Sequence, residues 1–441
     1  MNKVLPLISL FIISIISIFY WTLKSKNELY DAKWNAPDTT LAITINGEIS
    51  TTFPTTAAYE TSVECTSGTG KAEWNGSKWI LTTSGITKGS TKCNATFESL
   101  APAPNGWYEA GSGTLLASLR NSNTLKAPLT TPGAAISTAD EALLASTEDD
   151  YGASYYFRGA VTNNYVEFAN KCWRIVRVGG DGSVKLILHN DNAAGAANPC
   201  SSANNSTNAA FARYSGTYTS AFNTNYNDNA YVGFKYGTAG ASNYASAHAN
   251  TNKSTILTNL ENWYNNNLKT YEKVIDDTVW CNDKTNVTDT SYNPWGYSNV
   301  IGLGYGKNVT YYGATQRLVS TSGSTGGTGP SLKCNGELSK IISKVGLITV
   351  DELAFAGYAY GLGNTTTYLQ ENATDNTYWW SLSPDDFDGG YAGVWVVFGS
   401  YGRLAYSYVH STYGVRPSIS LVSLTTISGG SGTSENPYVV N

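Results

Sequence analysis

The alternation of apolar and polar positions predicts short β-strands along most of the chain. The Asn75-Gly76 pair between two tryptophan-containing runs is a strong signal for a β-hairpin. Residues 155–191 predict three or four strands, with a turn at the glycine-rich residues 179–182. Further strands are expected towards the C-terminal end, within residues 393–399, 402–410 and 414–422.

Helical periodicity is confined to a few segments. In residues 254–275, Ser254 can cap a helix whose apolar side chains fall on one face. That face consists of Ile256, Leu257, Leu260, Trp263, Tyr264 and Leu268. Shorter helical pieces are expected within residues 114–121, 336–346 and 349–361. The order of strands, helices and strands, without βαβ alternation, predicts an α+β fold.

The pattern divides the chain into five parts. A small β-sandwich, interpreted as immunoglobulin-like and as a spacer, is followed by a Pro/Gly/Thr-rich linker and then by a larger domain. The larger domain contains long loops rich in Asn, Gly and Ser, including residues 190–252, where little regular structure is expected. The predicted parts are an N-terminal anchor and flank at 1–35, the sandwich at 36–100, the linker at 101–136, the larger domain at 137–425, and a closing turn and strand at 426–441.

The N-terminal part contains an uncharged apolar run. Residues 4–23 are 20 residues long, which is the length that a helix needs to cross a hydrocarbon layer of about 30 Å. The run is longer than a usual signal-peptide core, and no small-x-small cleavage site follows it. We therefore expect a single-pass membrane protein with a cytoplasmic N-terminus and extracellular domains; a cleaved signal peptide is the alternative.

Composition and cysteine spacing agree with an extracellular location. Only 14% of the residues are charged, whereas Tyr and Gly supply 31 and 43 positions, as in extracellular β-rich chains. The net charge of −5 argues against a nucleic-acid partner, and three His offer little imidazole metal chemistry. The six cysteines lack CxxC spacing, which favours disulfides over zinc. They fall into three sequence-local pairs, Cys65 with Cys93, Cys172 with Cys200, and Cys281 with Cys334, but the spacing leaves the disulfide connectivity open.

The most distinctive chemistry lies in residues 378–395, "YWWSLSPDDFDGGYAGVW". Asp385, Asp386 and Asp388 could supply the two carboxylates that glycoside hydrolysis requires. However, Asp and Gly in this order are also typical of a turn, which is the interpretation we prefer. Bound calcium is a further alternative, and no other cofactor is expected. Trp379 and Trp380 should point to opposite faces of a strand, with at least one in the core. Both of them, and Trp395, are predicted to be structural.

The segment after Trp395 predicts a hairpin whose second strand carries aromatic side chains on one face. Such a face is suited to binding a sugar or a protein. Together with the aspartate loop it defines a predicted ligand-binding surface. Its residues are Asp385, Asp386, Phe387, Asp388, Tyr391, Tyr401, Tyr406, Tyr408, His410 and Tyr413. His410 has no nucleophile or orienting partner in the sequence pattern, so no catalytic residue is predicted.

Five segments of the larger domain carry a resemblance to a known family. In order they are "WRIVRVGGDGSVKLIL", "LENWYNNNLKTYE", "VGLITVDELAFAG", "YWWSLSP" and "YGVRPSISL". They resemble a family of extracellular domains of Firmicutes and related gut bacteria, over residues 155–422. The resemblance implies a C-type lectin-like fold of the formylglycine-generating-enzyme type, also used by variable proteins of diversity-generating retroelements.

The resemblance implies structural positions rather than catalysis. No cysteine follows Cys334, so formylglycine-generating activity is not implied, and the arginine of the family's "W-W-L-R-S-P" pattern is absent before Ser383. Glu352 and Arg416 occupy recurring positions, where we expect them to pair or to bind backbone. The sequence therefore predicts a cell-surface binding or adhesion protein for a glycan or protein ligand. The alternatives are an extracellular glycan hydrolase and a purely structural envelope protein.

Overall fold

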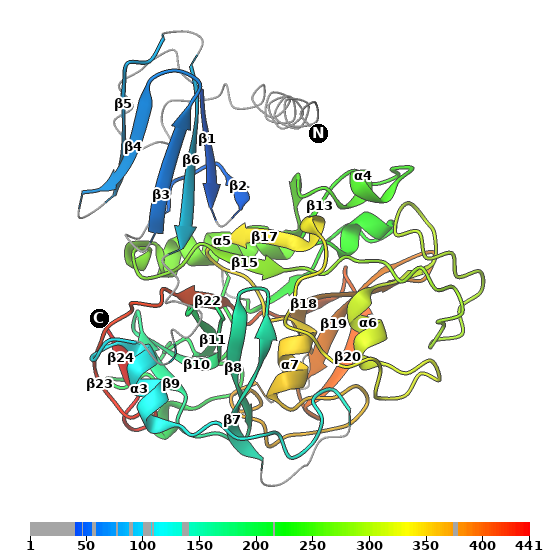
Figure 1. Cartoon of the computed structure of the whole chain (residues 1–441). Coiled ribbons are helices and arrows are strands. Elements are labelled where there is room, and N and C mark those ends of the chain that lie inside the picture. Colours follow the sequence, from blue (N-terminus) through cyan, green and yellow to red (C-terminus); the bar gives the residue numbers. More distant parts are fainter. Residues whose placement is uncertain are drawn as a thin grey trace. The chain divides into compact units, whose positions relative to one another are not determined.

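The computed structural model describes residues 40–45, 47–54, 59–75, 78–87, 91–99, 107, 110–134, 141–214, 217–373 and 378–441. The chain divides into two compact units, Met1–Leu100 and Ala101–Asn441. Figure 1 labels their strands and helices, and each unit is described by itself.

The first unit contains two small sheets. The four-stranded sheet has the order β2-β1-β6-β3, with β1 and β6 parallel. Its strands are β1 (Thr40–Ile45), β2 (Glu48–Ser50), β3 (Tyr59–Cys65) and β6 (Lys92–Ser99). The other sheet is the hairpin of β4 (Thr69–Trp74) and β5 (Trp79–Ser84), in which Trp74 lies opposite Trp79. The Asn75-Gly76 pattern predicted this hairpin. Its Trp79 ring contacts Phe97 of β6 edge-on at 5.1 Å, which packs the two sheets together.

The second unit is built around two larger sheets. The eight-stranded sheet has the order β22-β11-β10-β9-β24-β23, with β8 beside β10 and β7 beside β8. Its strands are β7 (Ala142–Asp149), β8 (Gly152–Gly159), β9 (Tyr165–Phe168), β10 (Lys171–Val178), β11 (Val184–Asn190), β22 (Ser418–Leu421), β23 (Ile427–Gly429) and β24 (Tyr438–Val440). Four of these strands lie where residues 155–191 predicted them.

The six-stranded sheet, whose β18, β19 and β20 are labelled in Figure 1, carries most of the predicted ligand-binding residues within its strands. Its order is β12-β21-β18-β19-β20, and β16 pairs with β18. The strands are β12 (Thr219–Ala221), β16 (Thr310–Tyr311), β18 (Tyr378–Phe387), β19 (Ala392–Phe398), β20 (Arg403–Tyr408) and β21 (Thr412–Gly414). Two small ribbons complete the unit: β13 (Lys235–Tyr236) with β14 (Asn252–Lys253), and β15 (Thr278–Cys281) with β17 (Lys340–Ser343).

The prediction of an α+β, C-type lectin-like fold is wrong, because the described chain is predominantly β-sheet. Its labelled α-helices have only 5 to 13 residues. They are α3 (Leu115–Ser122), α4 (Tyr244–His248), α5 (Thr255–Asn267), α6 (Gly313–Leu318) and α7 (Val350–Ala356). Single 3₁₀ turns occur at η2 (Ser202–Asn204), η3 (Asn229–Val232), η4 (Lys269–Tyr271) and η5 (Glu337–Ser339).

Helix α5 agrees closely with the sequence prediction. The Ser254 hydroxyl accepts from the Leu257 N–H, and the six predicted apolar side chains are buried. Residues 336–346, by contrast, were predicted as helical, but Lys340–Ser343 form β17. Pairing with β15 decides the outcome there, since the β-branched Ile341 and Ile342 suit a strand once a partner is present.

Two predicted peripheral segments belong to the core of the second unit. The supposed linker contains α3, whose Leu115, Leu116 and Leu119 are at most 1% exposed. The supposed closing segment 426–441 supplies β23 and β24 to the eight-stranded sheet. The loop-rich residues 190–252 also bury phenylalanines, among them Phe222 and Phe234. Long segments without regular structure can therefore fill the core when their few aromatic side chains point inward.

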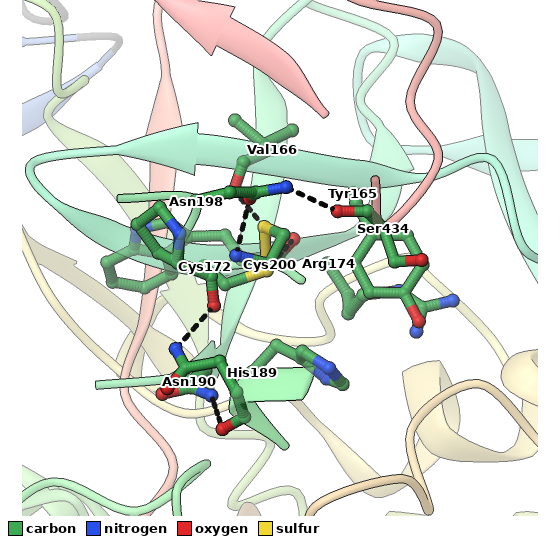
Figure 2. Close-up of a disulfide and its surroundings, with 12 residues drawn as sticks. Tyr165, Val166, Cys172, Arg174, His189, Asn190, Asn198, Cys200 and Ser434 are labelled. Carbon is green, nitrogen blue, oxygen red and sulfur yellow. Dashed lines mark hydrogen bonds between the residues drawn. A yellow bond between two sulfur atoms is a disulfide. The ribbon is translucent and has the colours of Figure 1, made fainter. Parts of the chain in front are cut away.

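Three disulfides join the sequence-local cysteine pairs. Cys65–Cys93 connects β3 with β6, and Cys281–Cys334 connects β15 with a loop. Figure 2 shows Cys172–Cys200 beside β10, where the Asn198 side-chain amide donates to the Ser434 carbonyl at 3.0 Å. Three disulfides are consistent with an extracellular protein.

The predicted single-pass membrane topology is not supported by the structure. Among the residues that the structure describes, no helix is long and apolar enough to cross a membrane. The segment expected to do so, residues 4–23, lies outside the described residues. The transmembrane part of the predicted fold and the predicted membrane location are therefore unsupported.

Candidate functional site

Strand β18 continues through the aspartates that the sequence pattern assigned to a turn. Tyr311 of β16 pairs with Asp386, and Thr310 pairs with Phe387, so a segment distant in sequence extends the strand. The pairing with β19 is irregular on both sides of Pro384. Asp385 and Asp386 are consequently at most 1% exposed. The prediction of an exposed loop at these residues is therefore wrong.

Among the described residues, no cation pairs with the two buried carboxyl groups. Asp385 Oδ1 accepts from the Thr315 hydroxyl at 2.6 Å, and the Tyr297 hydroxyl hydrogen-bonds Asp386. Burial raises the pKa of Asp385 to about 7. Burial, and then the neighbouring Asp385, raise the pKa of Asp386 well above its usual value. The Oδ2 atoms of Asp385 and Asp386 have no hydrogen-bond partner among the described residues. These groups are thus predominantly neutral near pH 6.

Both tryptophans of β18 are core residues. Trp379 and Trp380 are 1% and 0% exposed, so neither ring reaches the surface. The indole N–H of Trp380 donates to the Ser220 carbonyl at 2.8 Å. Trp395 of β19 is also fully buried and donates to the Thr315 hydroxyl at 3.1 Å. All three side chains are structural.

Four rings meet on the surface beside the end of β20, and we call them the Tyr408 patch. They are Tyr226, Tyr391, Tyr408 and His410. Tyr391 stacks on Tyr226 at 5.2 Å and on Tyr408 at 4.6 Å between ring centroids. The three tyrosines are 38% to 40% exposed, and His410 is also exposed. The patch is therefore a continuous aromatic surface accessible to solvent.

Asp388 holds the Tyr408 patch in place. Its Oδ1 accepts the N–H groups of Gly390 and Tyr391 at 2.8 and 2.7 Å, and its Oδ2 accepts the Tyr408 hydroxyl at 3.1 Å. The carboxylate is half-buried at the edge of the rings. It thus fixes both the turn and one tyrosine, and it places a hydrogen-bond acceptor next to the aromatic surface.

Tyr226 was missed by the sequence prediction because it lies in the loop-rich segment, where nothing local marks it. Its backbone carbonyl accepts the Ala392 N–H at 2.8 Å, which places the Tyr226 side chain against the start of β19. This tertiary hydrogen bond has no counterpart in a sequence pattern. Trp295 was missed for the same reason; it stacks on Tyr406 at 4.8 Å from another long loop.

The predicted ligand-binding residues separate into different environments. Asp385, Asp386 and Phe387 are buried, and Tyr406 packs against Trp295. Only Asp388, Tyr391, Tyr408 and His410 come together in the Tyr408 patch. Tyr401 and Tyr413 belong to another ring cluster, with Tyr378 and Phe398.

No protein-family model matches the chain, and no curated protein or solved structure is similar to it. The resemblance carried by the five sequence segments therefore remains a prediction.

Glu352 and Arg416, two of the five residues predicted to be structural, do not pair with each other. Glu352 is 3% exposed and accepts from Arg177 and Lys185 at 2.8 and 2.6 Å. Burial favours the neutral acid, but the two cations outweigh it and lower the pKa of Glu352 to about 2. Its other oxygen accepts the Thr349 N–H, which completes a capping box at α7.

Arg416 binds backbone inside the second unit. Its guanidinium donates to the carbonyls of Leu188 at 3.0 Å and Leu369 at 2.6 Å, and it lies 4.9 Å from the Trp379 ring centroid. The residue is fully buried without a carboxylate among these partners. It therefore ties β11 of the eight-stranded sheet to a loop and to β18 of the six-stranded sheet.

The charged network around Glu352 lines a pocket. Arg317 bridges Asp283 and Asp351, each at 2.7 Å, and Arg177 also contacts Asp149 at 2.8 Å. The cations of this network are thus paired with its carboxylates, which indicates a structural role rather than an open binding site.

The described residues contain no group of three or more His, Cys, Asp or Glu side chains that could hold a metal ion. Calcium at the aspartates, one of the alternatives from the sequence, would have to rely on backbone carbonyls and on the two carboxyl groups of β18.

Proposed function

We propose that the chain is an extracellular binding protein that takes a glycan at the Tyr408 patch. The observation that carries the proposal is the contiguous set of exposed, mutually stacked rings with a fixed carboxylate at its edge. Three disulfides and the low content of charged residues support the extracellular setting.

The chemistry of the patch suits a sugar. A pyranose presents an apolar C–H face, which can lie against an exposed tyrosine, and hydroxyl groups at its rim. Asp388 Oδ2 is the natural acceptor for such hydroxyls, since a carboxylate has several lone pairs and only one hydroxyl bond is formed to this oxygen. The internal stacking and the turn around Asp388 preorganise the surface, which lowers the entropic cost of binding.

The hydrolase alternative has less support. Glycoside hydrolysis requires two carboxyl groups about 5 to 9.5 Å apart on either side of the scissile bond. Asp385 and Asp386 are adjacent in β18 and at most 1% exposed, so a glycosidic bond does not reach them. With Asp385 and Asp386 inaccessible, Asp388 lacks the second carboxyl group of the predicted catalytic set.

Glycan-array binding of the full chain tests the proposal. After a ligand is found, Tyr391→Ala and Tyr408→Ala should each weaken binding by about tenfold or more, as for a central contact residue. Tyr271→Ala is the matched control, because Tyr271 is 41% exposed and lies outside the patch. Glycan binding that both patch variants retain would place the site elsewhere, and binding of proteins but not glycans would contradict the ligand class.

A further inference from the structure

A second ring cluster lies at the other end of the β19–β20 hairpin, and we call it the Arg403 patch. It consists of Tyr378, Phe398, Tyr401, Arg403 and Tyr413. Successive side chains of a strand point to opposite faces, so Arg403 and Ser407 share the face opposite to Tyr406 and Tyr408. The Ser407 hydroxyl contacts the Tyr413 hydroxyl at 3.1 Å, which places Tyr413 on the Arg403 side. The two patches are therefore separate surfaces.

The Arg403 patch packs on the core through Tyr413, while Tyr401 extends into solvent. Tyr378 stacks on Phe398 at 4.4 Å with an interplanar angle of 14°, and Tyr413 packs on the core residue Trp380 at 5.1 Å. Tyr401 is 59% exposed, and its ring contacts Phe398 at 4.9 Å. The turn that carries Tyr401 is held by the Gly402 N–H, which donates to the Phe398 carbonyl at 2.9 Å. The patch is thus a rigid platform with one prominent ring.

Arg403 lies against aromatic rings at the surface. Its guanidinium carbon lies 5.3 Å from the Phe398 ring centroid and 5.4 Å from that of Tyr401. Within the described parts of the chain, no carboxylate lies within ion-pair distance of it. Five arginines elsewhere form such ion pairs: Arg158, Arg174, Arg177, Arg213 and Arg317. A half-exposed guanidinium held by rings keeps its hydrogen-bond fork available for an anion.

We propose that the Arg403 patch binds a carboxylate-bearing sugar unit of an acidic polysaccharide. The guanidinium fork matches a carboxylate in a bidentate arrangement, and Tyr401 offers a face to the sugar ring. The guanidinium thus selects the carboxylate of the ligand, and the Tyr401 ring selects its sugar ring. The chain carries a net charge of −5, so a general electrostatic attraction cannot draw in a polyanion. Binding of an acidic polymer must therefore come from a local site.

The experiment compares two polymers with the same sugar backbone. Polygalacturonate and its fully methyl-esterified form differ in the carboxylate charge, and calorimetric titration of the full chain measures both. We expect the acid form to bind and the ester to bind at least about tenfold more weakly, because charge-assisted bidentate bonds are lost. Equal affinity for the two polymers, or no affinity for the acid form, overturns the proposal.

Substitutions of Arg403 and Tyr401 then test whether polygalacturonate binds at the Arg403 patch. Arg403→Gln should reduce the affinity for polygalacturonate by about tenfold or more, and Arg403→Lys should recover only part of it because an ammonium lacks the planar fork. Tyr401→Ala tests the ring face at a highly exposed position, where folding is not at risk. Tyr271→Ala, at an exposed position outside both patches, should leave this affinity unchanged.

Two outcomes contradict the assignment while leaving the Tyr408 patch untouched. If Tyr408→Ala abolishes binding of polygalacturonate and Arg403→Gln does not, the acidic polymer uses the other patch. If poly-glutamate binds as tightly as polygalacturonate and with the same dependence on Arg403, the patch recognises carboxylates of peptides rather than acidic sugars.

Discussion

Replacing Asp385 by asparagine should make the protein more stable than the wild type above pH 7. The Asp385 carboxyl is fully buried, and no cation among the described residues compensates its charge. The other ionisable groups that influence the carboxyl pair are Asp388 and Tyr297. Burial therefore favours the neutral acid in the folded state, whereas the unfolded chain presents an ordinary aspartate. The asparagine side chain introduced by Asp385→Asn has a similar shape and stays neutral at every pH.

The size of the effect follows from the difference between the two pKa values. The folded pKa is about 7, and an unfolded aspartate has a pKa of about 3.9. The folded state thus binds the proton more tightly, and the contribution of this proton to stability is complete below about pH 4 and is lost as the pH rises through 7. At about 1.4 kcal/mol for each unit of difference between the two pKa values, the total loss is about 4 kcal/mol, and more than half of it falls between pH 5 and pH 8.

Urea unfolding of the full, oxidised chain at pH 5, 6, 7 and 8 measures this loss. The free energy of unfolding of the wild type should fall across the series, and that of Asp385→Asn should fall by about 2 to 3 kcal/mol less. Asp289→Asn is the control, since Asp289 is exposed and its pKa is lowered by hydrogen bonds from Ser291, so it stays ionised across the series. Parallel curves for wild type and Asp385→Asn would refute the argument.

Three further changes test the packing. Arg416→Glu should lower the melting temperature and cost at least about 3 kcal/mol, because it places an anion among buried carbonyls, whereas Lys273→Glu at an exposed position should leave the melting temperature unchanged. Thr349→Ala should cost about 1 kcal/mol in urea unfolding through loss of the α7 cap, and Thr349→Ser should retain most of the stability. Replacing both Cys172 and Cys200 by serine should cost about 3 to 4 kcal/mol, since their separation of 28 residues closes a long loop; an unchanged urea midpoint would contradict this.

The features that the sequence predicted well depend on neighbours in the chain. The cap at Ser254 and the apolar face of α5 are set within a few turns of one helix, and the Asn75-Gly76 hairpin is set by a short turn. The cysteine pairs were also evident from their spacing, although the pattern alone left the connectivity open. In each case the determining contacts lie close together in sequence.

The errors occurred where a distant segment decides the conformation. Lys340–Ser343 became a strand because β15 lies beside it. The membrane and lectin-like interpretations extrapolated from an apolar run and from short motifs to a whole architecture, and neither a short motif nor local periodicity specifies how sheets are ordered.

The candidate site shows the same division. The sequence by itself determined that aromatic residues and aspartates follow one another within residues 378–413, and that strand alternation divides them between two faces. Only the tertiary structure decided which of them face solvent. Pairing with β16 buries Asp385 and Asp386, and a backbone hydrogen bond brings Tyr226 to the patch. The physical reason is that burial and ring stacking depend on partners from distant loops, whose positions short-range propensities do not set.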